Sequence, residues 1–184
     1  TESTPVAGRV VLALLPVVSV LALALLPGAR AAFQANLGAV HQSQAELSVY
    51  SWPKWPIQDA LRRDPGVILD DALTRYDAAM RLDANNVTAH RRLGQIALSR
   101  GDTNAARLHL EQAFAEAPDQ RVTRQLLGEV YALDGDADRA AALWQGLEIG
   151  QGQMDVRHWW ISQVAAPQQV AAFERAIART HTEP

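Results

Sequence analysis

Hydrophobic and polar positions divide the chain into an uncharged amino-terminal stretch and a longer part with a helical pattern. The interval 10–29 is 20 residues long and carries no charge. From residue 69 onward apolar residues recur three and four positions apart, as at Leu69, Ala72 and Tyr76. This is the spacing of one buried helix face. The pattern predicts an all-α protein.

The uncharged stretch is long enough to cross a bilayer. Twenty residues in a helix extend about 30 Å, the thickness of the hydrocarbon core. We therefore predict a transmembrane helix over 10–29, after a leader over 1–9, and Pro16 is a possible kink. A cleaved signal peptide also fits, because Arg9 is a basic leader residue and Ala29-Arg30-Ala31 has the form of a cleavage site. We favour an uncleaved anchor that packs within a larger membrane assembly.

Two consecutive blocks of 34 residues, over 87–154, repeat the same small and apolar positions. This period is typical of a helix-turn-helix repeat. A glycine inside the first helix of a block lets the second helix approach closely, and a glycine after that helix suits a left-handed turn. The residues that define the repeat, and that we expect to be structural, are Leu93, Gly94, Gly101, Ala106, Pro118, Leu127, Gly128, Tyr131, Gly135, Ala140 and Trp144.

This set of residues resembles the tetratricopeptide repeat (TPR) family over 69–154. The resemblance implies a short TPR-like α-solenoid whose first unit is incomplete, because only the second helix of that unit matches. It also implies that 155–184 forms a capping helix pair. In this family the first helix of each unit lines a concave surface. The partner-binding residues implied on that surface are Thr88, Arg91 and Gln95 in one unit, and Gln125 and Glu129 in the next.

Residues 30–68 form the predicted connector between membrane and repeats. The Ala/Gln-rich segment 31–49 is expected to continue as a helix, and 57–63 to form a short second helix. Between them, Tyr50, Trp52 and Trp55 crowd a stretch that contains two prolines. These aromatics fit a patch that docks a partner or the membrane surface. They fit equally well a plug over the open end of the repeats.

Composition and motifs argue against several function classes. The formal net charge is −3, so no basic face points to nucleic acid. The chain has no cysteine, and its five histidines show no metal-binding spacing. Phosphate loops and nucleophile elbows are absent from the sequence as well. We expect no enzyme activity, no cofactor, no metal and no small-molecule substrate.

The leading hypothesis is a non-catalytic scaffold subunit whose single span packs on a multisubunit membrane complex. Its partners would be other integral-membrane subunits and the lipid bilayer. The composition looks bacterial, which places the span in the inner membrane, with the soluble domain expected outside the cytoplasm. One alternative is a membrane-tethered adaptor for a transient soluble partner. Another is a tail or remnant of an envelope-glycan enzyme, because the order of span, aromatic linker and repeats is similar to the tail of O-antigen ligase-like proteins.

Overall fold

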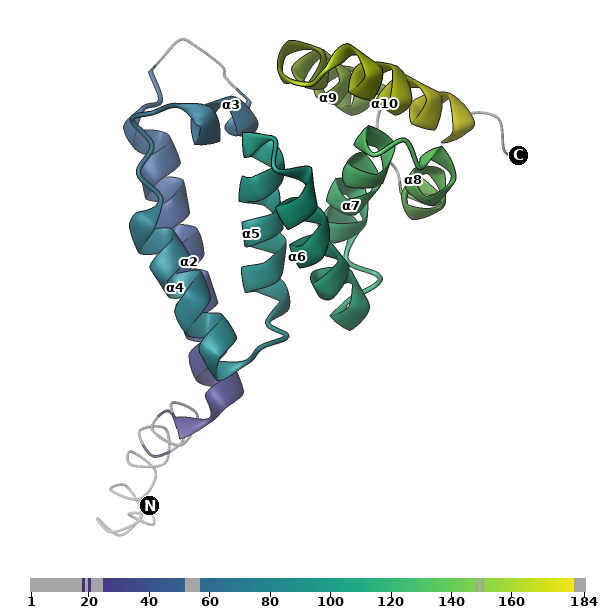
Figure 1. The fold of residues 1–184 in the computed structure, drawn as a ribbon. Coiled ribbons are helices and arrows are strands. Elements are labelled where there is room, and N and C mark those ends of the chain that lie inside the picture. The colour runs from purple at the N-terminus through teal and green to yellow at the C-terminus, as the bar shows by residue number, and fades with distance from the viewer. Residues whose placement is uncertain are drawn as a thin grey trace, which may run out of the picture.

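The structure is a computed structural model that describes residues 25–51, 57–147, 149 and 151–180, together with residues 18 and 20. The regular structure in these ranges is entirely helical, as the sequence predicts (Figure 1). The helices are α2 (Pro27–Ser48), α3 (Gln58–Arg63), α4 (Asp70–Leu82), α5 (Val87–Arg100), α6 (Thr103–Glu116), α7 (Arg121–Leu133), α8 (Ala137–Trp144), α9 (Gln151–Val164) and α10 (Pro167–Thr180).

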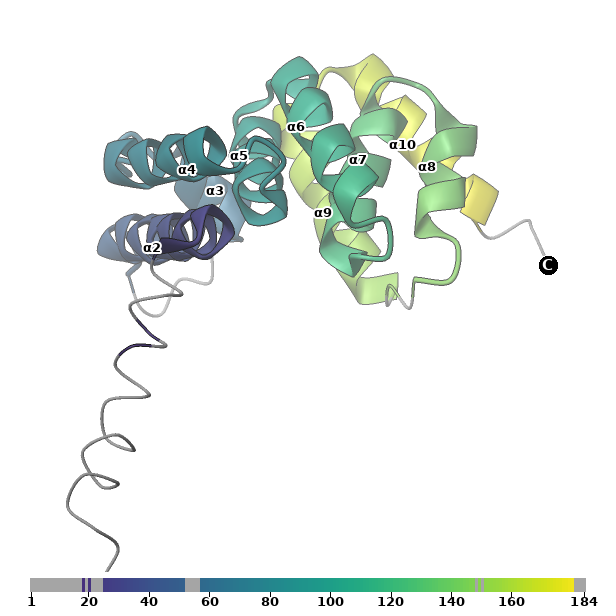
Figure 2. The same ribbon diagram turned by 90° about the horizontal axis from the view of Figure 1, so that it is seen from below.

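Three pairs of helices, α2 with α4, α5 with α6 and α7 with α8, pack side by side (Figure 2). Helix α10 packs against α7 and α8 at the far end of the row. The short helix α3 lies beside α5. Two hydrophobic cores result, one around Tyr76 between α2, α4 and α5, and one around Trp144 and Phe173.

In each of the three pairs, a glycine on the first helix faces a large side chain on the second helix. A Cβ atom on Gly94 would lie 2.5 Å from Cγ of Leu110. A Cβ on Gly128, 34 positions later, would lie 2.8 Å from Cδ1 of Trp144. The same arrangement occurs in the first pair, where a Cβ on Gly38 would lie 2.7 Å from Cε1 of Tyr76. Glycine is required at these crossings because no side chain fits between the helices.

Helix α2 is the first helix of the opening pair, which the sequence analysis describes as incomplete. Gly38 and Tyr76 are 38 positions apart, whereas Gly94 and Leu110 are 16 apart. The 22 extra positions hold α3 and its flanking loops. The insertion breaks the 34-residue period. A search at fixed spacing therefore finds α4 but does not find α2 as the first helix of this pair. Its sequence signal is the dipeptide Leu37-Gly38, which matches Leu93-Gly94.

The turns inside the second and third pairs have the predicted geometry. Gly101 and Gly135 follow α5 and α7 with φ of 83° and 88°, the left-handed region that favours glycine. The next residues, Asp102 and Asp136, cap α6 and α8 by accepting hydrogen bonds from the backbone N–H groups three positions on. Pro118 follows the end of α6, as expected for a residue that cannot continue a helix.

Within the residues that the structure describes, no helix is both long and apolar enough to cross a membrane. Most of the predicted span over 10–29 lies outside these residues, and so do Trp52 and Trp55. The predicted helix over 31–49 is confirmed, since α2 covers 27–48.

Candidate functional site

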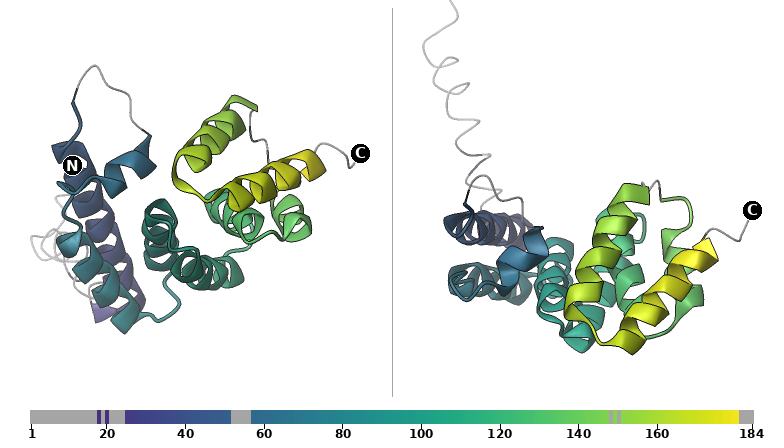
Figure 3. Two further views of the ribbon diagram at one scale, coloured as in Figure 1. Left: turned by 45° about the horizontal axis from the view of Figure 1, so that its top comes forward. Right: turned by 90° about the horizontal axis from the view of Figure 1, so that it is seen from above.

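Helices α3 and α9 are far apart in the sequence but meet through a buried ion pair beside α5. Nη1 of Arg157 on α9 lies 2.6 Å from Oδ2 of Asp59 on α3, across 98 residues of sequence. Both helices approach the same end of α5, the upper end in Figure 1, and Figure 3 shows this end from two further directions. Helices α3 and α9 therefore cover the row of helix pairs at this end of α5.

Arg157 also binds Glu129, which projects from the middle of α7. Nε of Arg157 donates to Oε1 of Glu129 at 3.0 Å, and Nη2 donates to Oε2 at 2.7 Å. Glu129 is only 1% exposed. Burial raises the pKa of Glu129 above its usual value, although the Arg157 guanidinium acts in the opposite direction. A bidentate arginine is the partner that such an enclosed carboxylate needs.

A second buried arginine, Arg62 on α3, ties the same region to α2. Its Nε donates to Oε1 of Glu46 at 2.8 Å, and its Nη1 donates to the Ser99 hydroxyl at 3.0 Å. That hydroxyl lies 2.9 Å from Oδ1 of Asp59. Burial alone would raise the pKa of Asp59, but Arg157 and Arg62 outweigh burial and hold this pKa below its usual value.

These contacts form one charged cluster that joins α2, α3, α5, α7 and α9. Its members are Glu46, Asp59, Arg62, Ser99, Glu129 and Arg157. Each charged side chain in it has at least one partner of opposite charge. No group of three or more acidic or histidine side chains in the described ranges is arranged to hold a metal ion. The arrangement binds five helices together through buried charges.

The repeat pattern predicts Glu129 as a groove residue. It does not predict a role for Asp59, Arg62 or Arg157. No local pattern marks these three residues, because their shorter contacts reach other helices; Asp59 and Arg62 also form an i,i+3 pair within α3 at 3.8 Å. The structure places Glu129 beneath Arg157, where it is enclosed. Gln125, one turn earlier on α7, is half-buried, and its Oε1 accepts from Nε2 of Gln153 on α9 at 3.3 Å.

The other predicted partner-binding residues that the structure describes lie on α5 and just after α2, and the carbonyl of Gln95 accepts from Ser99 of the charged cluster at 2.8 Å. Thr88, Arg91 and Gln95 are half-buried along α5, and Tyr50 is half-buried just after α2. Nε of Arg91, Nε of its neighbour Arg92 and Oε1 of Gln95 are enclosed and meet no hydrogen-bond partner among the described residues. Burial, with the positive charge of Arg92, lowers the pKa of Arg91.

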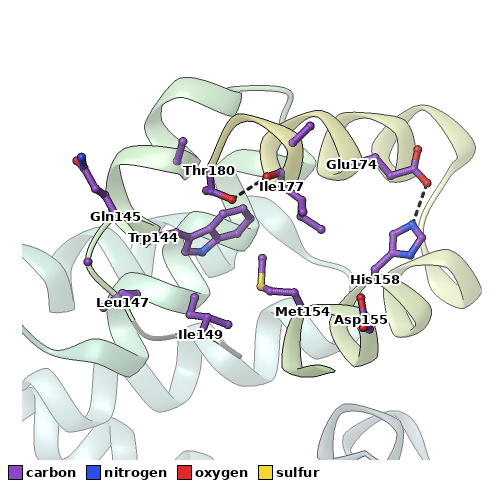
Figure 4. Close-up of a pocket in the computed structure, with 13 residues that line it drawn as sticks. Trp144, Gln145, Leu147, Ile149, Met154, Asp155, His158, Glu174, Ile177 and Thr180 are labelled. Atoms are coloured by element: carbon purple, nitrogen blue, oxygen red, sulfur yellow. Dashed lines mark hydrogen bonds and ion pairs between the residues drawn. The ribbon is translucent and has the colours of Figure 1, made fainter. Parts of the chain in front are cut away.

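An apolar pocket of about 640 Å³ opens between α8, α9 and α10 (Figure 4). Trp144, Met154 and Ile177 point into it from three different helices, and Leu147 and Ile149 come from the segment that follows α8. At one side Nε2 of His158 lies 2.9 Å from Oε1 of Glu174. The volume falls in the range of ligand-binding pockets. Its lining suits an apolar side chain of a partner.

A pair of histidines links α5 to α6 and predicts a pH-dependent stability. Nδ1 of His90 lies 3.0 Å from Nδ1 of His109, and Nε2 of His90 donates to the carbonyl of Ala84. Burial lowers the pKa of His109 below 6.5, and His90 adds to the effect, against the influence of Asp77. The unfolded chain then binds more protons than the folded chain below pH 6.5. We expect the contribution of His109 to stability to be complete above pH 6.5 and to fall with decreasing pH.

Thermal unfolding of the full chain between pH 7.5 and 5.5 measures this effect. The H109Q variant should show a smaller decrease in the unfolding temperature than the unaltered chain. H41Q, which changes a histidine on α2, serves as the matched control. Equal pH profiles for H109Q and the unaltered chain would contradict the assignment.

No protein-family model and no curated protein sequence matches this chain.

Proposed function

We propose that this chain is a non-catalytic, membrane-anchored scaffold subunit, whose single span packs on a multisubunit membrane complex. Its repeated helix pairs would form a short TPR-like solenoid that mediates protein–protein interaction and stabilises the assembly. The observation that carries the proposal is the recurrence of the glycine crossings at Gly94 and Gly128, 34 residues apart. Repeats of this kind stack into extended concave surfaces that bind other molecules.

The arrangement of charged groups supports a scaffold more than an enzyme. The most buried carboxylate, Glu129, is bound by Arg157, so it is not poised as a general acid or base. The uncharged stretch 10–29 precedes the helix pairs directly and supplies the proposed anchor.

Extraction of the full chain from its native membrane in a mild detergent tests the proposal. We expect the chain to migrate with other membrane subunits in native electrophoresis and to co-purify with them. The L14R variant places a charge in the proposed span, which costs about 2.5–3.5 kcal/mol at a helix centre. It should lose both membrane retention and co-migration. A full-length chain that migrates without other subunits and co-purifies with no other protein would refute this function.

A second function, an adaptor for a transient soluble partner, is favoured by the two adjacent, half-buried arginines Arg91 and Arg92 on α5. An anionic segment of a partner would satisfy both arginines. In the same experiment, R91E should then abolish capture of a soluble protein while leaving co-migration with membrane subunits intact. If only L14R has an effect, the adaptor function fails.

A further inference from the structure

Helix α9 does not approach the helices that it covers as closely as the paired helices approach each other. Of the helices that the structure describes, only α10 has a Cα atom within 8 Å of a Cα atom of α9. In each helix pair, by contrast, a glycine faces a large side chain and the two backbones come close together. Long side chains of α9 therefore span the distance to α3, α5 and α7.

The packing is incomplete on two sides of α9. A cavity of about 70 Å³ lies between α5, α7 and α9, beside Arg157 and Ile161. On another side, Met154 and His158 of α9 line the apolar pocket of about 640 Å³ (Figure 4). Well-packed protein interiors contain few voids larger than a water molecule. Helix α9 is therefore packed more loosely than the helix pairs.

Three side chains on one face of α9 hold it in place. Arg157 lies 2.6 Å from Asp59 on α3 and 2.7 Å from Glu129 on α7. Trp160 and Ile161, three and four positions later, are 8% and 3% exposed and belong to the larger hydrophobic core. Residues at these intervals share one helix face. The contacts of α9 thus form a pattern of one arginine followed by two apolar residues.

The surface beneath α9 has a complementary pattern of charge and apolar area. Its residues, which we name the α9-binding surface, are Asp59, Leu98, Gln125, Glu129 and Leu133. Asp59 also has Arg62 nearby, at 3.8 Å, whereas Glu129 is paired with Arg157 of α9. A helix that replaced α9 would have to supply a guanidinium group, because a buried carboxylate without its partner is costly. Charge complementarity therefore specifies what this surface binds.

We propose that α9 is an exchangeable cover of the α9-binding surface, and that a partner helix takes its place by presenting an arginine followed by apolar residues three and four positions later. Because α9 is tethered, it competes at an effective concentration in the millimolar range. A partner therefore displaces α9 only when it makes further contacts of its own. The inference rests on the interaction role proposed above for the helix pairs, but it does not depend on the membrane anchor.

Thiol labelling tests whether α9 opens by itself, because the chain contains no cysteine. I161C places a thiol on the inner face of α9, and L110C places one between α5 and α6. The replaced side chains are 3% and 0% exposed. Without denaturant, we expect I161C in the full chain to react at least ten times faster than L110C. Urea should accelerate I161C less, because local opening exposes less surface than global unfolding. Equal rates with equal urea dependence would overturn the inference.

Rescue by a peptide tests what the α9-binding surface recognises. The full-length R157Q variant weakens its own cover, and a fluorescent peptide of residues 151–164, stapled between the exposed positions 155 and 159, supplies the arginine in trans. We expect this peptide to bind R157Q at least ten times more tightly than the unaltered chain, and to raise the unfolding temperature of R157Q. A peptide that itself carries R157Q should bind at least ten times more weakly. A V156A peptide is the matched control and should bind normally, since Val156 is 46% exposed.

Several outcomes would contradict the exchange of α9. Failure of the peptide to bind a folded R157Q chain would overturn it. Equal binding of the two peptides would overturn the requirement for arginine. Labelling of I161C that depends on protein concentration would indicate exchange of α9 between copies of the chain, and would overturn the assigned partner. If R157Q unfolds, the I161C measurement still decides whether α9 opens. Neither test uses a membrane subunit, so its failure is distinct from the loss of co-migration that would refute the scaffold function.

Discussion

Replacement of Arg157 by alanine should cost about 3–5 kcal/mol of unfolding free energy, the penalty for leaving a buried charge without its partner. Glu129 would lose both of its bonds from Arg157, and it is almost fully enclosed. Asp59 would keep the hydrogen bond from Ser99 and the more distant Arg62, whose Nη1 is 3.8 Å from Oδ1 of Asp59. A loss of this size is a large fraction of the total stability of an ordinary domain. Urea unfolding of the full chain, followed by circular dichroism, measures it.

R139A is the matched control for R157A, because it removes the same side chain from an exposed position. The Arg139 side chain is 68% exposed and pairs with Asp136 at 3.3 Å. Exposed ion pairs contribute about 1 kcal/mol or less. The double variant R157M/E129M removes both charges of the buried pair and should recover most of the loss. Equal losses for R157A and R139A would mean that the charged cluster does not stabilise the fold.

The second large effect is expected from Gly128, where the added methyl group of alanine has no space. Its Cβ would meet the indole of Trp144, whose Nε1 donates to the carbonyl of Gln125 at 3.1 Å. Because this hydrogen bond holds the ring in place, the helices α7 and α8 must separate to admit the methyl group. Overpacking of this kind costs about 1–3 kcal/mol. Thermal unfolding of G128A in the full chain measures the loss.

G152A is the control for this prediction, since Gly152 is exposed in α9 and a Cβ there meets nothing within 4 Å. Alanine has the higher helix propensity, so G152A should be neutral or stabilising by up to about 1 kcal/mol. G94A, at the equivalent crossing with Leu110, should behave like G128A. Stability of G128A equal to that of G152A would show that the crossing does not require glycine.

The charged cluster limits which residues of the helix-pair surface a binding partner can reach. On a TPR-like surface, Glu129 and its neighbours would be expected to bind a partner. In this fold Arg157 binds Glu129 and Asp59, and the side chains of Arg157 and Asp59 cover Glu129. The half-buried polar part of α5 lies around Arg91 and Gln95. A partner that approaches this surface would meet those residues, whereas Glu129 would be reached only after α9 had moved away.

Local pattern was sufficient to predict the helices and their turns. Apolar spacing predicted α4 and α5, Gly101 and Gly135 marked the left-handed turns, and Pro118 marked the end of α6. These features depend on the backbone preferences of single residues and on contacts within a few positions.

Helix period and turn chemistry depend on neighbouring residues, so the sequence predicts the helices of the described ranges and the 34-residue recurrence of the central pairs. The pairing of α2 with α4 is seen only in the fold, since the insertion of α3 shifts that pair out of the period. Only the fold brings Asp59, Glu129 and Arg157 into one buried cluster. Burial and pairing depend on which helices meet in space, and local sequence does not encode a contact across 98 residues.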